Sequence, residues 1–184
     1  SFTHLKKHDF RLAEVPNADL NIANDYRNFT AEKAEEKWEE FFGTGGKFEK
    51  RRADNVLLID YLVTASPGFF ETATSDEVDE FFEKSLNFLT EKHGQNNVIY
   101  SVIHNDESTP HMHIKVVPEH AGKLNCKHFL GGAAKLKKLQ TDFAKEVEHL
   151  GLKRGAENSH AKHTTIKNFY KGVNKTKSNF LNDK

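Results

Sequence analysis

The stretch that decides the fold is NVIYSVIHNDESTPHMHIKVVP, residues 97–118. Two runs rich in β-branched and apolar residues, 97–104 and 113–118, flank the six polar or turn-forming residues NDESTP. Such a pattern predicts two antiparallel strands joined as a hairpin. Pro110 then falls at the start of a strand, where its missing N–H group costs no ladder hydrogen bond.

Three histidines gather at the mouth of this hairpin. His104 ends the first run and faces the start of the second, while His111 and His113 are two residues apart. Side chains two apart on a strand leave the same face, roughly 7 Å apart along the backbone. We therefore predict a divalent metal site with open coordination positions, which is typical of a catalytic centre. A polar strand edge with exposed histidines is the less favoured interpretation.

Two acids in the connecting loop extend this predicted site. Asp106 and Glu107 lie between His104 and the other two histidines. A carboxylate in this place can supply a further metal ligand or hold an imidazole in one tautomer.

The segments around the hairpin predict an α+β fold, an antiparallel sheet with helices packed on it. Apolar residues recur at helical spacing in three stretches, and the near-continuous apolar run VLLIDYLVTAS predicts a central strand covered on both faces. The predicted helices are 30–43, 74–94 and 135–151, and this strand is 56–66.

Length and composition predict one domain with a tail. The chain has 184 residues, 36% of them hydrophobic, which is enough for a single core. We expect a catalytic domain over 1–170 and a basic, loosely held tail over 171–184. The single cysteine, Cys126, excludes an intrachain disulfide, and no run is apolar enough to be a membrane span or signal peptide. A cytoplasmic protein fits these features best.

The net charge of zero hides a polarised chain. Residues 1–118 carry 13 basic and 21 acidic side chains, whereas 119–184 carry 14 and 6. A basic second half favours phosphate-bearing partners, although a lysine-rich end is often only solvated.

Several motifs resemble those of the MobV (Pre/Mob) plasmid mobilisation relaxases, which are related to the HUH-type DNA nickases. HNDESTPHMH matches the signature His-x-Asp-Glu-x-Thr-Pro-His-x-His at every defined position. KKHDFR, VPNAD and Asn24 resemble the first motif of that family, and RGAENSHAKHTTIKNF resembles its closing basic segment. The similarity covers nearly the whole chain.

The resemblance implies a palm like that of rolling-circle replication initiators, and an activity. The family uses a histidine-bound metal to nick one DNA strand at a plasmid origin of transfer, later rejoining it. The sequence opens without the apolar strand that usually precedes the first motif, so we expect an incomplete sheet and a poorly positioned His8.

The same resemblance implies roles for individual residues. His8 would be the nucleophile, forming a phosphoramidate with DNA, in place of the tyrosine that most relatives use. Glu107 would accept or orient its proton, and Arg11 would clamp a phosphate. The metal at His104, His111 and His113 would be Mn²⁺ or Mg²⁺, with Zn²⁺ as a further candidate. DNA contacts would come from Asn24, Arg154, Lys162 and His163.

Partners and competing functions complete these expectations. The DNA would be single-stranded or a hairpin at the origin, other proteins would supply the conjugation machinery, and a homodimer is compatible with the sequence. One alternative is a hydrolase that uses the three-histidine metal and activated water. Another is an origin or promoter DNA-binding module without activity. If the protein followed its tyrosine-using relatives, Tyr26 would be the nucleophile.

Overall fold

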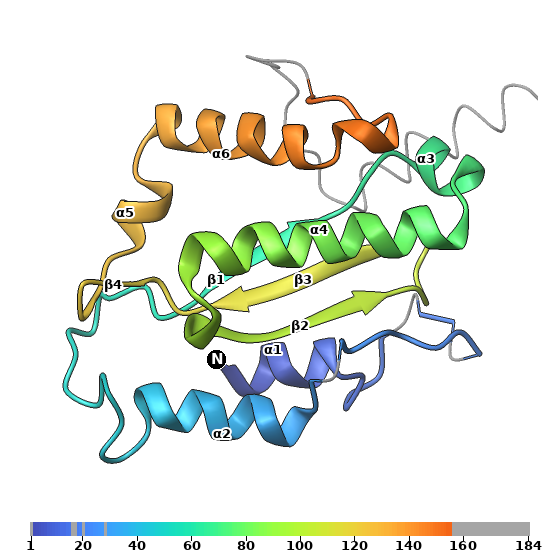
Figure 1. Cartoon of the computed structure of the whole chain (residues 1–184). Helices are drawn as coiled ribbons and strands as arrows, with labels where there is room; N and C mark the ends of the chain where they lie inside the picture. Colours follow the sequence, from blue (N-terminus) through green and yellow to red (C-terminus); the bar gives the residue numbers. More distant parts are fainter. Residues whose placement is uncertain (1, 16–17, 20, 28, 156–184) are drawn as a thin grey trace, which may run out of the picture. The chain divides into compact units, whose positions relative to one another are not determined.

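The computed structural model describes residues 2–15, 18–19, 21–27 and 29–155. In this part of the chain, an antiparallel sheet with the strand order β1-β3-β2 carries helices on both faces, which confirms the predicted α+β class (Figure 1). The strands are β1 (Ile59–Val63), β2 (Val98–His104), β3 (His111–Val116), β4 (Glu119–His120) and β5 (Lys123–Leu124). The α-helices are α1 (Phe2–Asp9), α2 (Ala31–Phe42), α3 (Pro67–Thr72), α4 (Ser75–His93), α5 (Cys126–Leu130) and α6 (Ala133–Glu146), with 3-10 turns at Gln95–Asn97 and Glu148–Leu150.

The predicted hairpin forms between β2 and β3. In its register His104 pairs with His111, and Met112 pairs with Ile103. The returning strand begins two residues earlier than predicted, so both His111 and His113 belong to it.

The prediction that residues 56–66 form a central strand is wrong. β3 lies in the middle of the sheet. Among the described residues β1 is an edge strand, which pairs with β3 on one side only. Side-chain exposure alternates along β1, and Leu62 is 61% exposed. Part of the apolar run lies outside the strand, where Leu57 and Leu58 pack against a different set of core residues. The continuous apolar run of residues 56–66 is therefore not a strand buried on both faces.

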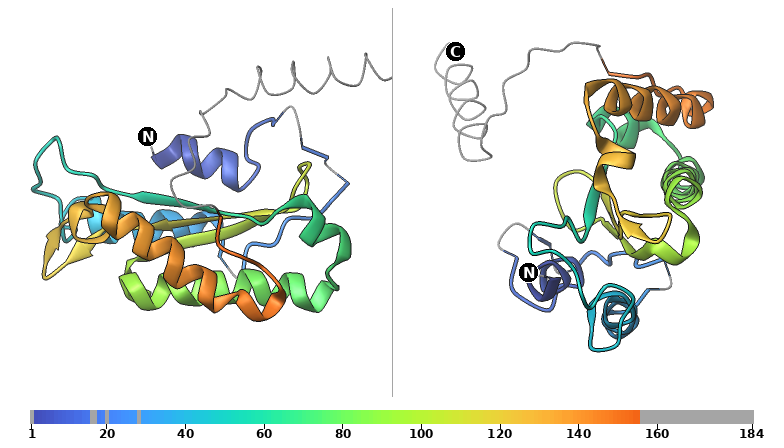
Figure 2. Two further views of the ribbon diagram at one scale, coloured as in Figure 1. Left: turned by 90° about the horizontal axis from the view of Figure 1, so that it is seen from above. Right: turned by 90° about the vertical axis from the view of Figure 1, so that its left-hand side faces the viewer.

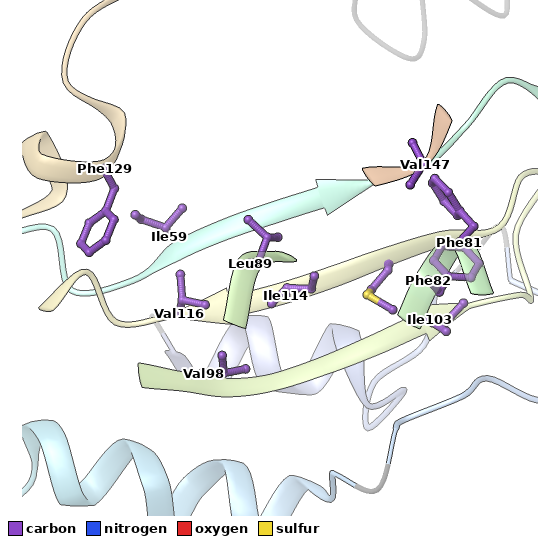
Figure 3. Close-up of a cluster of buried hydrophobic side chains, with 11 residues drawn as sticks. Ile59, Phe81, Phe82, Leu89, Val98, Ile103, Ile114, Val116, Phe129 and Val147 are labelled. Carbon is purple, nitrogen blue, oxygen red and sulfur yellow. The ribbon is translucent and has the colours of Figure 1, made fainter. Parts of the chain in front are cut away.

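Helix α4 covers one face of the sheet. Thr74 caps it, and the reciprocal hydrogen bonds between Thr74 and Glu77 form the predicted capping box. The inward side of this helix packs on alternate residues of β3 and on Val98 and Ile103 of β2, as Figure 3 shows. The cluster consists of Ile59, Phe81, Phe82, Leu89, Val98, Ile103, Met112, Ile114, Val116, Phe129 and Val147.

Helices α1 and α2 cover the opposite face (Figures 1 and 2). Phe2 stacks on Trp38 of α2 with ring centroids 4.2 Å apart, and Phe10 packs on Tyr100 of β2 at 5.0 Å. These aromatic contacts hold both ends of α1 against the sheet, and they carry His8, near its C-terminal end, to the mouth of the hairpin.

Two smaller outcomes concern the ends of predicted elements. The third predicted helix starts at Ala133 and ends at Glu146, and residues 148–150 form a 3-10 turn in place of its last turn. The predicted tail, 171–184, lies outside the described residues. No helix of the described chain is long and apolar enough to cross a membrane.

Candidate metal centre

The hairpin brings together the three predicted metal ligands. One nitrogen from each of His104, His111 and His113 lies within 4.8 Å of the others. Nδ1 of His104 is 3.3 Å from Nε2 of His111. Three nitrogens this close can bind one ion, as the spacing of the histidines predicts.

The second nitrogen of each imidazole has an oxygen acceptor. Nε2 of His104 donates to the carbonyl oxygen of Asp9 at 2.9 Å, and Nδ1 of His111 donates to that of Thr109 at 3.0 Å. Nδ1 of His113 donates to Oδ1 of Asp60 at 3.0 Å. Because these oxygens can only accept, each ring has one nitrogen lone pair left for a metal.

The electrostatics also fit a divalent ion. His104 is fully buried, and burial lowers its pKa to about 4, which keeps the imidazole in the neutral form that metals bind. Burial alone would raise the pKa of Asp60, but the hydrogen bonds from His113 and Lys115 outweigh it and lower the pKa. Three imidazole nitrogens suit Zn²⁺ and, with water in the open positions, Mn²⁺, whereas Mg²⁺ prefers oxygen ligands.

His8 lies beside this cluster, so the expected poor positioning is not seen. Its ring centroid is 5.7 Å from that of His104 and 6.4 Å from that of His113. Nδ1 of His8 is 3.1 Å from Oδ1 of Asp9, and the side chain is 45% exposed. A carboxylate accepts the Nδ1 proton, and Nε2 therefore keeps its lone pair in a position that a ligand can reach.

Arg11 joins the two loop acids to the backbone of His8. Its Nε and Nη2 donate to the two carboxylate oxygens of Asp106 at 2.7 and 2.6 Å, and Nη2 also donates to Glu107 at 2.8 Å. Its Nη1 donates to the carbonyl oxygen of His8 at 3.1 Å. The hydrogen bonds from Arg11, with help from Asn24, lower the pKa of Asp106 to about 2.

Asn24 braces the start of the loop. Its Nδ2 donates to Asp106 at 2.8 Å, and its Oδ1 accepts the backbone N–H of Asn105 at 2.9 Å. The structure thus brings His8, Arg11, Asn24, Asp106 and Glu107 together. Arg154 is not among them, since its Nε donates to Thr141 of α6 at 2.9 Å. Lys162 and His163 lie outside the described residues.

Two acids at the site were missed from the sequence. Asp9 is buried and contacts His8, and Asp60 contacts His113. A signal for Asp60 was present, because a lone acid inside the apolar run VLLIDYLV has to have a polar partner. Asp9 directly follows the candidate nucleophile, but nothing in the local pattern distinguishes it from a solvated residue.

The sequence matches the Mob_Pre family, described as plasmid recombination enzyme, over residues 5–171. The chain belongs to this family. A plasmid recombination enzyme of Streptococcus agalactiae is 33% identical over 177 residues, covering 91% of this Mob_Pre chain and 36% of the relative. The type 2 enzyme of Staphylococcus aureus is 39% identical over 134 residues, covering 72% and 32%. The chain therefore spans about a third of the length of these relatives.

Solved structures confirm the fold of this Mob_Pre chain. The Mn-bound MobM relaxase domain in complex with plasmid pMV158 oriT DNA superposes with a TM-score of 0.80 and 31% identity, covering 92% of each chain. A second Mn-bound complex, with a 3′ thiophosphate on the DNA, gives a TM-score of 0.77 and 30% identity.

Proposed function

We propose that this Mob_Pre chain is a relaxase domain that nicks one strand of DNA at a plasmid origin of transfer and later rejoins it. The observation that carries the proposal is the placement of His8, with a free Nε2, beside three histidine nitrogens that converge on one point. The similarity to a relaxase domain that binds Mn and oriT DNA supports it.

The chemistry follows from what cleavage of a phosphodiester needs. A divalent ion held by His104, His111 and His113 acts as a Lewis acid that stabilises charge on the nonbridging oxygens of the scissile phosphate. Nε2 of His8 attacks phosphorus, so that an N–P bond forms and the P–O3′ bond breaks. The 3′ oxygen takes up a proton from water and leaves as a hydroxyl, and the 5′ phosphate remains on His8 as a phosphoramidate whose Nδ1 proton stays in the hydrogen bond to Asp9. Attack by the 3′ hydroxyl reverses these steps.

The remaining residues of the site hold this geometry. Glu107, expected from the sequence to accept or orient the proton of the nucleophile, accepts a hydrogen bond from Arg11, and Asp9 contacts Nδ1 of His8, so we assign the orientation of that proton to Asp9. Arg11, expected from the sequence to clamp a phosphate, donates to Glu107, Asp106 and the backbone of His8. We therefore propose that Arg11 aligns these groups. Its positive charge would also attract the DNA phosphate electrostatically.

The DNA contacts complete the proposal. Origin DNA, single-stranded or folded as a hairpin, would reach the exposed face of His8. Lys162 and His163 of the closing basic segment, together with Arg154, would neutralise backbone phosphates. Other proteins would supply the conjugation machinery.

Trapping the covalent product tests this function. Supercoiled DNA carrying the mobilisation origin of the encoding element is incubated with the protein and Mn²⁺, denatured and digested, and DNA-linked peptides are sequenced by mass spectrometry. We expect an adduct on His8 that disappears in His8→Ala, in His111→Ala and in excess chelator. Tyr26→Phe is the matched control and should retain the adduct.

The other outcomes distinguish the competing functions. An adduct on Tyr26 would preserve the enzyme class and overturn the nucleophile. Metal-dependent release of small products without any adduct would favour the hydrolase, and origin binding without a nick would favour the DNA-binding module.

A further inference from the structure

A buried lysine lies between the nucleophile and the metal centre. Lys115 of β3 is completely buried and leaves the same face of the strand as His111 and His113. Its Nζ is 2.9 Å from Oδ2 of Asp9 and 2.6 Å from Oδ2 of Asp60. One ammonium group thus pairs with two carboxylates that come from different elements.

Each of these carboxylates uses its other oxygen to bind a histidine. Oδ1 of Asp9 contacts Nδ1 of His8 at 3.1 Å, and Oδ1 of Asp60 contacts Nδ1 of His113 at 3.0 Å. Nζ of Lys115 also lies 3.3 Å from Nδ1 of His113, but its contact with Asp60 is shorter, at 2.6 Å, so we take the carboxylate as the partner of both the ammonium and the ring N–H. A continuous set of polar contacts therefore runs from His8 through Asp9, Lys115 and Asp60 to His113.

The sheet register places most of this set in one row. Lys115 pairs with Asp60 of β1 on one side and with Tyr100 of β2 on the other. The hydroxyl of Tyr100 donates to Oδ2 of Asp9 at 2.8 Å, so this oxygen has two donors. Rigid strands therefore position Lys115, Asp60, His113 and Tyr100, whereas His8 and Asp9 come from α1.

The cost of burying a charge argues that this lysine has a role beyond stability. Taking an ammonium group out of water costs several kcal/mol, and apolar side chains of similar volume often stabilise a core as well as a buried ion pair. Val102 and Ile99 on the same face show that apolar side chains occupy neighbouring positions. A lysine here secures the orientation of two carboxylates, which an apolar residue would leave unpaired.

We propose that Lys115 is a positioning residue that fixes His8 and His113 in the same tautomer, with Nδ1 protonated and Nε2 facing the reaction centre. It acts through Asp9 on the nucleophile and through Asp60 on the metal ligand, so that both are aligned by one buried cation. This inference rests on the proposed function for its catalytic consequence, but its structural content holds in the resting protein.

The test compares Lys115→Met, which keeps the length of the side chain and removes its charge, with Lys37→Met, a control on the partly buried lysine of α2. Histidine ¹⁵N NMR of the metal-free protein reports the tautomer of His8, and calorimetry reports the affinity for Mn²⁺. We expect His8 in the Nδ1–H tautomer in the native protein and a mixture of tautomers in Lys115→Met. The same variant should bind Mn²⁺ and form the DNA adduct about 10-fold or more weakly, the range seen for residues that orient metal ligands.

Two further variants test the Asp9 contact and the Asp60 contact of Lys115 separately. They also keep the proposal testable if Lys115→Met does not fold. Asp9→Asn should slow adduct formation, change the His8 spectrum and, because Lys115 is shared, weaken Mn²⁺ binding by less than Asp60→Asn does. Asp60→Asn should weaken Mn²⁺ binding and, because Lys115 is shared, also shift the His8 signals.

Each result supports or overturns the inference. A folded Lys115→Met protein with an unchanged His8 tautomer and unchanged Mn²⁺ affinity would show that the lysine is only structural. Unchanged His8 signals in Asp60→Asn would overturn the coupling even if Lys115→Met does not fold. Absence of an adduct in the native protein would remove the proposed function and leave the NMR and calorimetric tests standing.

Discussion

His104 and His111 lie directly opposite each other in the β2–β3 hairpin, with Nδ1 of the first 3.3 Å from Nε2 of the second. The other nitrogen of each ring donates to a backbone carbonyl oxygen, so both rings direct lone pairs at the same point. Two such lone pairs repel each other unless a cation or a proton lies between them. The geometry of the hairpin therefore favours a state in which a metal ion or a proton lies between the two rings.

Metal binding should stabilise the folded chain. At 100-fold excess over the dissociation constant, Mn²⁺ should add about 3 kcal/mol to the free energy of unfolding, seen as a melting temperature higher by several degrees. His111→Ala should abolish this shift, whereas His120→Ala, which removes a ring stacked on His128 outside the centre, should leave it unchanged. An equal shift in both variants would contradict binding at the hairpin.

The cap of helix α4 should make stability depend on pH. The backbone N–H and hydroxyl of Thr74 donate to Glu77 and lower its pKa. A lowered folded-state pKa means that the contribution is present above the ordinary value for glutamate and is lost as the pH falls through the folded value. Urea unfolding should therefore show that Glu77→Gln destabilises the protein at pH 7 and makes little difference near pH 3. Glu91→Gln, at the other end of the helix, is the matched control.

The hairpin and its three histidines could be predicted because all the determinants are local. The strand period sets which side chains share a face, and the six-residue connection sets which ends meet, so residues 104–113 contain the whole ligand set. Helix α4 was readable for the same reason, since its cap and apolar stripe are contiguous.

The strand order and the buried lysine could not be predicted because they depend on contacts between distant segments. The pattern of residues 56–66 does not reveal that Leu57 and Leu58 pack on one cluster while Ile59 packs on another. Lys115 looks like the polar residue of an ordinary amphipathic strand. Its partners Asp9 and Asp60 come from α1 and β1, and only the assembled sheet brings them within 3 Å of its amine.

The Arg11–Asp106 pair should be required for folding stability. The Asp106 side chain is 2% exposed and would keep only the neutral donor Asn24 in Arg11→Ala, so we expect a loss of about 3 kcal/mol in the free energy of unfolding. Arg11 has a positive φ of 53°, and alanine retains the β-carbon, so the backbone strain is nearly unchanged. Chemical denaturation of Arg11→Ala, Asp106→Asn and the double variant measures the coupling. Additive losses would show that the pair contributes no mutual stabilisation.

Asn24 separates a structural role from direct DNA recognition. Its side chain donates to Asp106 and accepts from the backbone of Asn105, so Asn24→Asp replaces a donor with an anionic oxygen 2.8 Å from Asp106. We expect this variant to lose about 2 kcal/mol of unfolding free energy, because the carboxylate of Asp106 loses a hydrogen bond and gains a like charge. Asn21→Ala, in the same segment, removes a side chain that donates to exposed Asp19 and should cost well under 1 kcal/mol.

Binding of single-stranded origin DNA is measured in parallel by fluorescence anisotropy. If Asn24 acts as a brace, the loss of affinity in Asn24→Asp and Asn24→Ala will follow the loss of stability. If Asn24→Ala instead loses affinity at full stability, Asn24 contacts the DNA itself, as the resemblance of its motif to the family implies.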